Sequence, residues 1–461
     1  MNTIVTLLRK MFNNNDVIKV CAPTGTAAFN AGGETVHHLM ENRAGIFEYD
    51  AFSMDLSKKN KLTAKLKDLI CLIIDERSLL DAAITGVTEQ MMSETLFNGS
   101  LSHHDWGHIP VLIFVGDDYQ LPSITSGAFD CFEKKDGNKT VTNGRQQLQK
   151  AAEVVMSLTA SKRINDKQKM DKEIIRKTRT AEELEDSEIN KLLNLHLTNI
   201  QAKHSPTVVN DIKKKAIYLF YRNNKRIMKN LEILTETTGP SNPVAICKTK
   251  SNGLHDGKAI KSHFKNSEIP GTSIIAVGTK VALENRNFNP LWGLHNGAVG
   301  TVNEIIFAKG KNPNSGDLPD YVVVDFPLYK GPPWDTDNPT HVPIPVSMYR
   351  CDKKCCTRTF LPLEVSYART IHKFQGLTAG PVDEGKIPNI YECIICDPDD
   401  KKYEGSSLGL LYTTLSRATT LGDNNGLNSA IYFTGQEFKR VRITRLTKRK
   451  NSNDDYKQAI K

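Results

Sequence analysis

The sequence predicts an α/β protein with parallel sheets and an inserted region of short β strands. Two apolar runs, Leu69–Ile74 and Pro110–Val115, have the length and composition of buried parallel strands. Each run stops at polar side chains: Asp75 and Glu76 follow the first, and the polar turn Gly116–Pro122 follows the second. Open α/β sheets bind their ligands at the carboxyl ends of the strands, so these groups are candidates for the floor of a nucleotide site.

Length and composition set the limits of this interpretation. The 461 residues are enough for two to four domains with real cores. Hydrophobic residues make up 39% and charged residues 25%, which is typical of an ordinary soluble globular protein. The net charge of +9 permits a polyanionic partner without requiring one. No stretch is apolar enough to cross a membrane, and Arg9 and Lys10 interrupt any secretory pattern.

The N-terminal third reads as helix, strand and loop in turn. Residues 1–11 have helical spacing, and Val17–Cys21 reads as a strand. The small residues of Ala22–Ala28 form a strand-to-helix turn that lets backbone amides and hydroxyls approach a polyanion. Taken alone, this segment is better interpreted as a plain loop, and Asp75-Glu76 taken alone could equally be a solvated turn. Residues 41–67 form a polar, helix-prone connection to the central strand.

The middle of the chain is helical and charged. An amphipathic helix is predicted for Gly144–Thr159. Residues 160–215 carry many Lys and Glu at helical spacing, and most of these charges are interpreted as a solvated face. The strand Ala216–Phe220 follows, and then a helix that extends to Leu234.

Short β runs begin near Ile269 and are separated by turn-rich stretches. This pattern is typical of a small β barrel inserted into an α/β domain. The predicted strands are Ser273–Val277, Thr279–Leu283, Ala298–Phe307 and Tyr321–Phe326. The α/β texture returns in Leu363–Gly376 and Ile387–Asp397, and Leu408–Arg417 reads as a helix. The basic end of the chain could bind nucleic acid, or it could be a solvated tail.

Seven segments, taken in order, resemble the Pif-type (petite integration frequency) 5′-to-3′ DNA helicases of the RecD-like branch of helicase superfamily one. They are CAPTGTAAFNAGGETVHHL at 21–39, LIIDE at 72–76, VGDDYQLPSI at 115–124, LTASKRIND at 158–166, GTKVALENRNF…GLHNGAVGTV across 278–302, YARTIHKFQG at 367–376 and YTTLSRATTL at 412–421. Each motif is weak alone, but their order and spacing agree over nearly the whole chain.

The resemblance implies two RecA-like P-loop NTPase motor domains with an inserted small β barrel. The first motor domain would span residues 1–157 and be incomplete at its N-terminus. The second would span 158–267 and 356–437, with an SH3-like barrel at 268–355 and a basic tail at 438–461.

The resemblance also implies ATP and Mg²⁺ as cofactors and assigns catalytic roles. Asp75 matches the carboxylate that holds Mg²⁺ through water, and Glu76 matches the group that orients and deprotonates the attacking water. Gln120 matches the γ-phosphate sensor. Arg163 and Arg417 match two arginines of the second motor domain, whose planar charged forks suit a γ-phosphate.

Single-stranded DNA and duplex junctions are the partners that the resemblance implies. Gln375 and Gly376 belong to a segment that couples the second motor domain to nucleotide and DNA. Stacking and phosphate contacts would make DNA binding sequence-tolerant and salt-sensitive. Without the resemblance, His37 would be interpreted as a satisfied histidine at a helix start. The residues expected to contact DNA are Pro23, Thr24, Gly25, Thr26, His37, Thr370, His372 and Lys373.

One family motif is missing. The phosphate-binding loop GxxxxGK[ST] does not occur in the 461 residues. In a P-loop fold that string ends the first strand and opens the next helix. The sequence is therefore interpreted as an N-terminally incomplete helicase that lacks a central strand and binds phosphate weakly. A genuine start at Met1 would imply a non-hydrolysing protein.

Smaller departures and a cysteine group complete the list of unusual features. Arg77 stands where an apolar residue usually follows the acidic pair, and Asp118 stands where an aromatic residue is usual. Cys351, Cys355 and Cys356 lie beside the inserted region without paired CxxC spacing, so zinc is possible but core thiols are favoured.

The function expected from the sequence is ATP-dependent 5′-to-3′ DNA unwinding in replication, repair, recombination or telomere maintenance. The alternatives are a catalytically inactive single-stranded DNA-binding relic and a transposon-derived or unstable fragment. We expect a monomer without a membrane partner. It would be intracellular, since the nine cysteines sit mostly singly in apolar runs, and nuclear or mitochondrial in a eukaryote.

Overall fold

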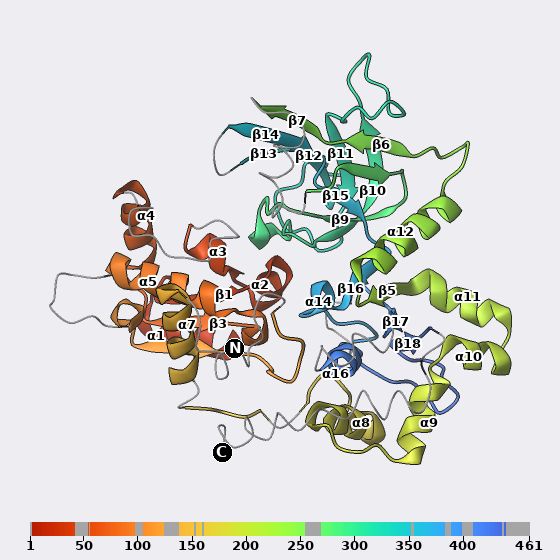
Figure 1. Cartoon of the computed structure of the whole chain (residues 1–461), viewed down its shortest axis with the longest axis horizontal. Helices are drawn as coiled ribbons and strands as arrows, with labels where there is room; N and C mark the ends of the chain where they lie inside the picture. The colour runs from red at the N-terminus through yellow and green to blue at the C-terminus, as the bar shows by residue number, and fades with distance from the viewer. Residues whose placement is uncertain are drawn as a thin grey trace. The chain divides into compact units, whose positions relative to one another are not determined.

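The computed structural model folds into two compact units (Figure 1). The first contains Met1–Asp211, Gln375–Asn389 and Pro398–Lys461, and the second contains Ile212–Phe374 and Ile390–Asp397. The structure describes residues 2–41, 54, 56–96, 105–123, 138–151, 154–158, 161–253, 269–351, 355–382, 389–398, 409–435 and 438. The basic stretch after residue 438 lies outside these ranges, and the domain boundaries expected above stay predictions. None of the described helices has the length and apolar character needed to span a membrane.

A parallel four-stranded sheet forms the centre of the first unit, with the strand order β2-β1-β3-β4. Its strands are β1 (Ile18–Ala22), β2 (Glu34–Thr35), β3 (Cys71–Ile74) and β4 (Val111–Phe114). Every residue of β3 is buried, as its aliphatic run predicts. Among the described strands β4 pairs only with β3, and Val111 is 41% exposed. The α/β class predicted from the two apolar runs is confirmed.

Helices surround this sheet. Those of the first unit are α1 (Asn2–Phe12), α2 (Gly25–Ala31), α3 (Val36–Leu39), α4 (Leu56–Leu66), α5 (Ala82–Leu96), α7 (Lys139–Lys150), α8 (Lys169–Thr180), α9 (Asp186–Asn194), α10 (Leu197–Lys203) and α16 (Leu410–Leu415), with 3₁₀ turns η2 (Arg77–Leu79) and η3 (Asp105–His108). The main core beneath them joins Leu72 and Ile74 of β3 to Leu62, Met92 and Trp106. The strand β18 (Ile431–Phe433) also belongs to this unit.

Helices α5 and α7 lie side by side at very short range (Figure 1). A Cβ atom on Gly86 would lie 1.9 Å from the Thr140 carbonyl oxygen, and one on Gly144 would lie 1.8 Å from the Ala82 carbonyl oxygen. Glycine at both positions is what allows the two backbones to touch.

Helix α7 differs from the helix predicted at Gly144–Thr159. It begins earlier because the Asn138 side chain accepts a hydrogen bond from the Val141 amide at 2.9 Å and caps the first turn. It ends at Lys150, and Val154–Leu158 is non-helical and exposed. The apolar spacing of 154–158 therefore misled the prediction, since adjacent β-branched valines favour extended backbone over helix.

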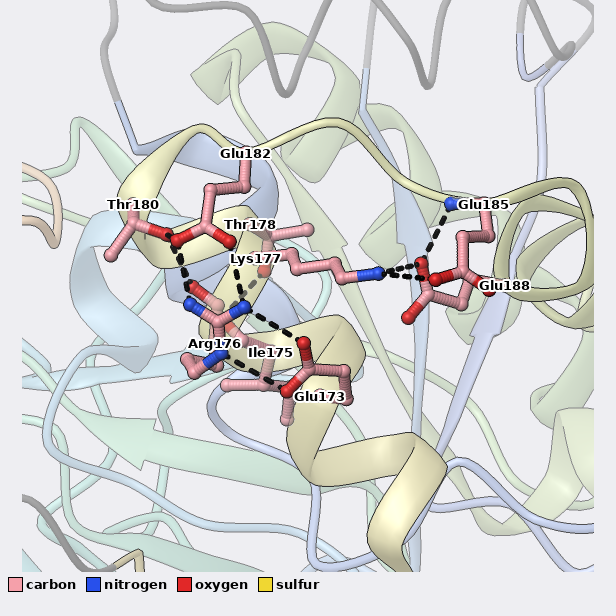
Figure 2. Close-up of polar contacts among 9 residues, drawn as sticks. All are labelled: Glu173, Ile175, Arg176, Lys177, Thr178, Thr180, Glu182, Glu185 and Glu188. Carbon is pink, nitrogen blue, oxygen red and sulfur yellow. Dashed lines mark hydrogen bonds and ion pairs between the residues drawn. The ribbon is translucent and has the colours of Figure 1, made fainter.

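Charged side chains join the end of α8 to the start of α9 (Figure 2). Arg176 bridges Glu173 and Glu182 through paired hydrogen bonds. Lys177 reaches Glu185 at 3.2 Å and Glu188 at 3.0 Å. Hydrogen bonding to Arg176 lowers the pKa of the exposed Glu182 to about 2. Exposed pairs of this kind stabilise a fold only slightly, so they act mainly as a local brace.

One ion pair in the same region is buried, which is an exception among charges of residues 160–215 that are interpreted mostly as a solvated face. Lys191 lies 2.6 Å from Asp171, whose second oxygen accepts a hydrogen bond from the Leu421 amide at 2.8 Å. Their exposed fractions are 8% and 1%. Each of the two Asp171 carboxylate oxygens therefore has a hydrogen-bond partner, and the pair ties α8, α9 and the segment after α16 together.

The second unit combines a parallel sheet with antiparallel strands. Strands β16 (Ala368–Thr370) and β17 (Cys393–Asp397) pair in parallel on either side of β5 (Ala216–Phe220), as predicted for these segments. Helix α12 (Asn223–Thr237) packs on β5 and β16, and α14 (Ile371–Phe374) follows β16. Helix α11 (Pro206–Lys215) leads into β5 from the first unit.

The inserted region consists of short strands that pair antiparallel. One sheet has the order β12-β11-β10-β9-β15, a second has the order β13-β14-β7, and β6 pairs with β8. These strands span β6 (Ala245–Lys248), β7 (Lys250–Gly253), β8 (Thr272–Ile275), β9 (Lys280–Leu283), β10 (Val299–Ile306), β11 (Tyr321–Asp325), β12 (His341–Pro345), β13 (Ser347–Arg350), β14 (Cys356–Phe360) and β15 (Leu363–Val365), with a 3₁₀ turn η4 (Pro290–Trp292). The strand pairing describes open sheets, so closure into a barrel stays a prediction.

The α5–α7 contact generates a stability prediction. Replacing Gly144 with Ala is expected to lower the free energy of unfolding by about 1–3 kcal/mol, because the added methyl forces the two helix backbones apart. Chemical denaturation would measure the loss. The matched control is Gly239→Ala, where an added Cβ meets no atom within 4 Å. Equal losses in the two variants would contradict the close-packing argument.

Candidate functional site

The carboxyl ends of β1, β3 and β4 carry the predicted polar groups side by side. The strands are in parallel register, with Cys21 opposite Ile74 and Ile74 opposite Phe114. The Asp75 amide donates to the Cys21 carbonyl at 2.8 Å, and the Val115 amide donates to the Ile74 carbonyl at 2.8 Å. The acidic pair therefore stands between the turn after β1 and the turn after β4, as the sequence predicts.

Glu76 is the centre of the site. Its backbone is left-handed, with φ 52° and ψ 50°, which is rare for a non-glycine residue and is frequent at functional sites. Its carboxylate accepts a hydrogen bond from Gln375 Nε2 at 3.4 Å, and the same amide nitrogen donates to Ser78 Oγ at 2.9 Å. Burial raises the pKa of Glu76, and the positive charges of Arg417 and Arg163 only partly offset this effect.

The Asp75 carboxyl group is also shielded from water. Burial raises the pKa of its carboxyl group, while a backbone hydrogen bond at Glu76 acts in the opposite direction. Two adjacent carboxyl groups with raised pKa values at a strand end form a natural site for a divalent cation or for proton transfer.

Two arginines face Glu76. Arg163 donates a hydrogen bond to the Ser416 carbonyl, and Arg417 donates to Ser416 Oγ at 3.1 Å. Arg417 is 2% exposed. Arg163 is exposed as a whole residue, whereas its guanidinium group is largely desolvated. Desolvation and mutual repulsion lower the pKa of Arg163, although an arginine stays protonated at neutral pH. Within the described part of the chain neither arginine forms an ion pair with a carboxylate.

Gly376 lies beside the Glu76 carboxyl group. Its φ of 85° is left-handed, and a Cβ atom there would lie 3.6 Å from Glu76 Oε1 and 3.7 Å from Ala27. The Asn30 side chain on α2 donates to the Gly376 carbonyl at 2.8 Å. This contact joins the 375–376 segment to α2.

Two glutamine side chains have buried oxygens without a partner. Gln120 Oε1 and Gln375 Oε1 are buried and accept no hydrogen bond from any described residue. Buried polar atoms in native proteins are nearly always paired, so an orphan at a site marks a place for a ligand or water. An amide oxygen can only accept a hydrogen bond, and a water molecule near Glu76 is a suitable donor.

A second polar cluster, which the sequence reasoning missed, holds the Gln120 turn. Asp117 accepts hydrogen bonds from Arg179 Nη2 at 3.1 Å and from the Tyr412 hydroxyl. The Arg179 guanidinium lies 4.4 Å from the centre of the Tyr119 ring. The Leu121 amide donates to Thr413 Oγ1 at 2.9 Å. The turn after β4 is therefore bound directly to α16, which precedes Arg417.

The signals for these missed residues differ. Asp117 and Tyr412 lie inside the recognised motifs, so their polar character alone could have nominated them. Asn30 lies inside the motif at 21–39, but nothing in the sequence singles it out there. Arg179 lies in the charged stretch that is interpreted as a solvated face, and Ser78 carries no motif of its own. Only the three-dimensional contacts identify Arg179 and Ser78.

Arg77 and Asp118, the two departures from the family pattern, form an ion pair with each other. Arg77 Nη1 lies 3.5 Å from Asp118 Oδ2, with both side chains mostly buried. The Arg77 amide also donates to the Val115 carbonyl at 2.9 Å. The unusual cation and the unusual anion thus occur as a pair, and the local packing that they put in doubt is preserved.

The residues expected to contact DNA in the first unit lie at the ends of β1 and β2. Thr24 caps α2, with its Oγ1 accepting from the Ala27 amide at 3.2 Å, and Gly25 and Thr26 form the buried first turn. His37 lies on α3, and burial lowers its pKa. A neutral imidazole can stack or hydrogen-bond at neutral pH but supplies no charge to a phosphate.

The remaining members of that set lie in the second unit. His372 lies 5.7 Å from the Tyr221 ring centre, and burial lowers its pKa as well. The Lys373 amide donates to Thr370 Oγ1 at 3.4 Å, and its ammonium pairs with Glu284 at 2.8 Å. The predicted roles of these residues stay predictions.

Parts of this chain are similar to known proteins. Residues 1–192 match the family model of PIF1-like helicases. The ATP-dependent DNA helicase PIF1 of Saccharomyces cerevisiae (strain YJM789) is 28% identical over 146 residues. Over this N-terminal part the chain is similar to PIF1-like helicases. The match with the yeast protein covers 30% of this chain and 16% of that protein.

Solved Pif1 helicase structures share the fold. Pif1 helicase from Candida albicans superposes with a TM-score of 0.66 and 19% identity over 99% of this chain and 91% of that chain. Pif1 helicase from Bacteroides, in complex with ADP-AlF₃ and single-stranded DNA, gives a TM-score of 0.60 and 19% identity over 96% of this chain and 87% of that chain. The α/β fold expected from the motifs is confirmed.

The donor set fits a nucleotide–Mg²⁺ complex in part. Paired carboxyl groups, two arginines without carboxylate partners and two orphan amide oxygens suit a metal-bound triphosphate and a water molecule. A glycine-rich loop with its lysine would normally supply the nest for the β- and γ-phosphates, and no such string occurs in the sequence.

The raised pKa of Glu76 predicts a pH-dependent stability difference. Its charged form is disfavoured in the folded state, so Glu76→Gln should be at least as stable as the wild type at neutral pH. The gain should vanish as the pH falls below 4.5, where the carboxyl group is protonated in both states. Denaturation at neutral and acidic pH would measure it. Glu182→Gln is the control of opposite sign, since the pKa of Glu182 is lowered.

The Asp117–Arg179 pair predicts a large coupling energy. A double-mutant cycle with Asp117→Ala and Arg179→Ala should give about 1 kcal/mol or more, because the pair is part-buried and shared with Tyr412. The same cycle on Glu182 and Arg176, an exposed pair at the end of the same helix, should give less than about 0.5 kcal/mol. Similar values for both pairs would contradict a special role for the Asp117 cluster.

Proposed function

We propose that this chain is the motor region of an ATP-dependent 5′-to-3′ DNA helicase. The observation that carries the proposal is the largely desolvated Glu76 carboxyl group, whose charge interacts with two arginines that have no carboxylate partner among the described residues. Fixed positive charge beside a buried base suits the transfer of a phosphoryl group to water. The match to PIF1-like helicases over residues 1–192 supports the same choice.

Each residue has a definite task in this proposal. Glu76 orients the attacking water and takes its proton, and its raised pKa brings a carboxylate closer to the operating pH of a general base. Asp75 would hold Mg²⁺ through water, and bound Mg²⁺ would neutralise phosphate charge. Arg163 and Arg417 stabilise charge on the transferred group, while the Gln120 and Gln375 oxygens accept hydrogen bonds from the water.

DNA is the proposed partner. A solved structure of Bacteroides Pif1 has single-stranded DNA bound, and another concerns unwinding of forked double-stranded DNA by two coordinating Pif1 helicases. The threonine-rich turn after β1 and the partly buried imidazoles His37 and His372 would contact a strand by hydrogen bonds and stacking. We propose a monomer as the working unit, with 5′-to-3′ movement and a nuclear or mitochondrial location in a eukaryote.

A second candidate is a single-stranded DNA-binding relic without turnover. The missing GxxxxGK[ST] string favours it, because triphosphate binding without the loop lysine is severely weakened.

The deciding experiment measures ATP turnover with Mg²⁺, with and without single-stranded DNA. We expect negligible turnover from these 461 residues and DNA-stimulated turnover when the protein is extended by a phosphate-loop segment encoded upstream. Glu76→Gln in the extended protein should lower turnover by at least about 100-fold while leaving DNA binding intact.

The other outcomes separate the alternatives. DNA binding without turnover in the extended protein would favour the relic. DNA-stimulated turnover by the present chain alone, abolished by Glu76→Gln, would mean that another element replaces the phosphate loop. A chain that neither melts cooperatively nor binds DNA would indicate a nonfunctional fragment.

A further inference from the structure

Three cysteines meet at one end of a small sheet in the second unit. Strands β13 and β14 pair antiparallel up to Arg350 opposite Thr357, and the Cys351 amide donates to the Cys356 carbonyl at 3.0 Å in the next position. Cys355 directly precedes β14. The hairpin therefore brings together three thiols that lie within six residues of sequence.

The spacing of the sulfur atoms suits a shared metal ion. Cys351 Sγ lies 3.6 Å from Cys355 Sγ, which lies 3.9 Å from Cys356 Sγ, and all three sulfurs are within 4.8 Å of one another. Zinc bound tetrahedrally at about 2.3 Å from each thiolate places neighbouring sulfurs about 3.8 Å apart. A disulfide would need about 2.05 Å, and none of the three cysteines forms one.

The small apolar core around the three thiols is a second, independent reason to expect a bound metal ion. The apolar cluster at this end of the sheet contains only four buried residues, Ile269, Cys351, Cys356 and Phe360, with Tyr349 and Cys355 packed beside them. A core this small supplies little stability, and small units of this kind are commonly held by a metal or by disulfides. Two of the four core side chains are themselves potential ligands.

The local charges favour thiolates at the hairpin end. The sequence around the group is cationic, with Arg350, Lys353, Lys354 and Arg358, which balances the negative charge of a trithiolate site.

We propose that Cys351, Cys355 and Cys356 bind a thiophilic divalent cation of the Zn²⁺ type, which staples the β13–β14 hairpin. Each metal–sulfur bond replaces an S–H bond, so binding one Zn²⁺ releases one proton for each thiol that was protonated. The fourth tetrahedral position would be taken by water or another group on the side of Cys355, the partly exposed member.

The test uses the full chain, purified reduced and metal-free, with Co²⁺ alone as the spectroscopic probe. Tetrahedral thiolate coordination would appear as a sulfur-to-cobalt charge-transfer band with visible d–d bands, saturating at one Co²⁺ per chain and reversed by Zn²⁺. Loss of a group that only hydrogen-bonds to a ligand costs roughly 10- to 100-fold in affinity, so Cys351→Ser and Cys356→Ser should each cost at least about 100-fold.

Two controls keep this result interpretable. Cys247→Ala, in the buried strand β6 outside the cluster, should bind Co²⁺ like the wild type. Alkylation of the wild type followed by mass spectrometry needs no variant: Zn²⁺ should protect the three cluster cysteines and leave the alkylation of the other thiols unchanged.

The proposal would be overturned by a folded wild type that gives no thiolate–cobalt band, or by cluster variants that retain wild-type affinity. Protection of all cysteines alike, or a disulfide within the cluster of protein that binds no metal, would overturn it equally.

Discussion

The burial of the Glu76 carboxyl group at the end of β3 is the constraint on which the rest of the first unit depends. Removing a carboxylate from water is unfavourable, and burial raises its pKa even with two arginines nearby. The fold holds it there with groups from three segments. The Gln375 amide is shared between Glu76 and Ser78, Gly376 lies beside the carboxyl group, and Asn30 of α2 holds the Gly376 carbonyl. A charged site assembled this way is pre-organised before any ligand arrives.

The same principle explains why the site is connected to α16. Arg417 lies just past that helix and is almost fully buried, so its position depends on where α16 lies. The Tyr412 hydroxyl donates a hydrogen bond to Asp117, and Thr413 Oγ1 accepts one from the Leu121 amide, so the helix is fixed against the segment that carries Gln120. A change at the Gln120 turn would therefore be felt at the arginine.

Much of this arrangement could be predicted from the sequence. The apolar runs that end at Asp75 and at Gly116 gave β3, β4 and the position of the site, because buried parallel strands leave a clear pattern. Arg163 and Arg417 could be found only by resemblance, since a lone arginine has no local signature. The contacts of Arg179, the pairing of Arg77 with Asp118 and the early start of α7 could not be predicted, because they depend on partners distant in sequence or on a single cap.

Binding of Mg²⁺ and a fluorescent ATP analogue to the wild type, Arg163→Ala and Arg176→Ala, each extended by a phosphate-loop segment, tests the central claim most directly. Arg163 faces Glu76, whereas Arg176 is an exposed arginine held by two glutamates on α8. The account predicts saturable binding that is equal in the wild type and Arg176→Ala and at least about tenfold weaker in Arg163→Ala. Equal affinity in all three proteins, or no saturable binding in any, would contradict a nucleotide site at Glu76.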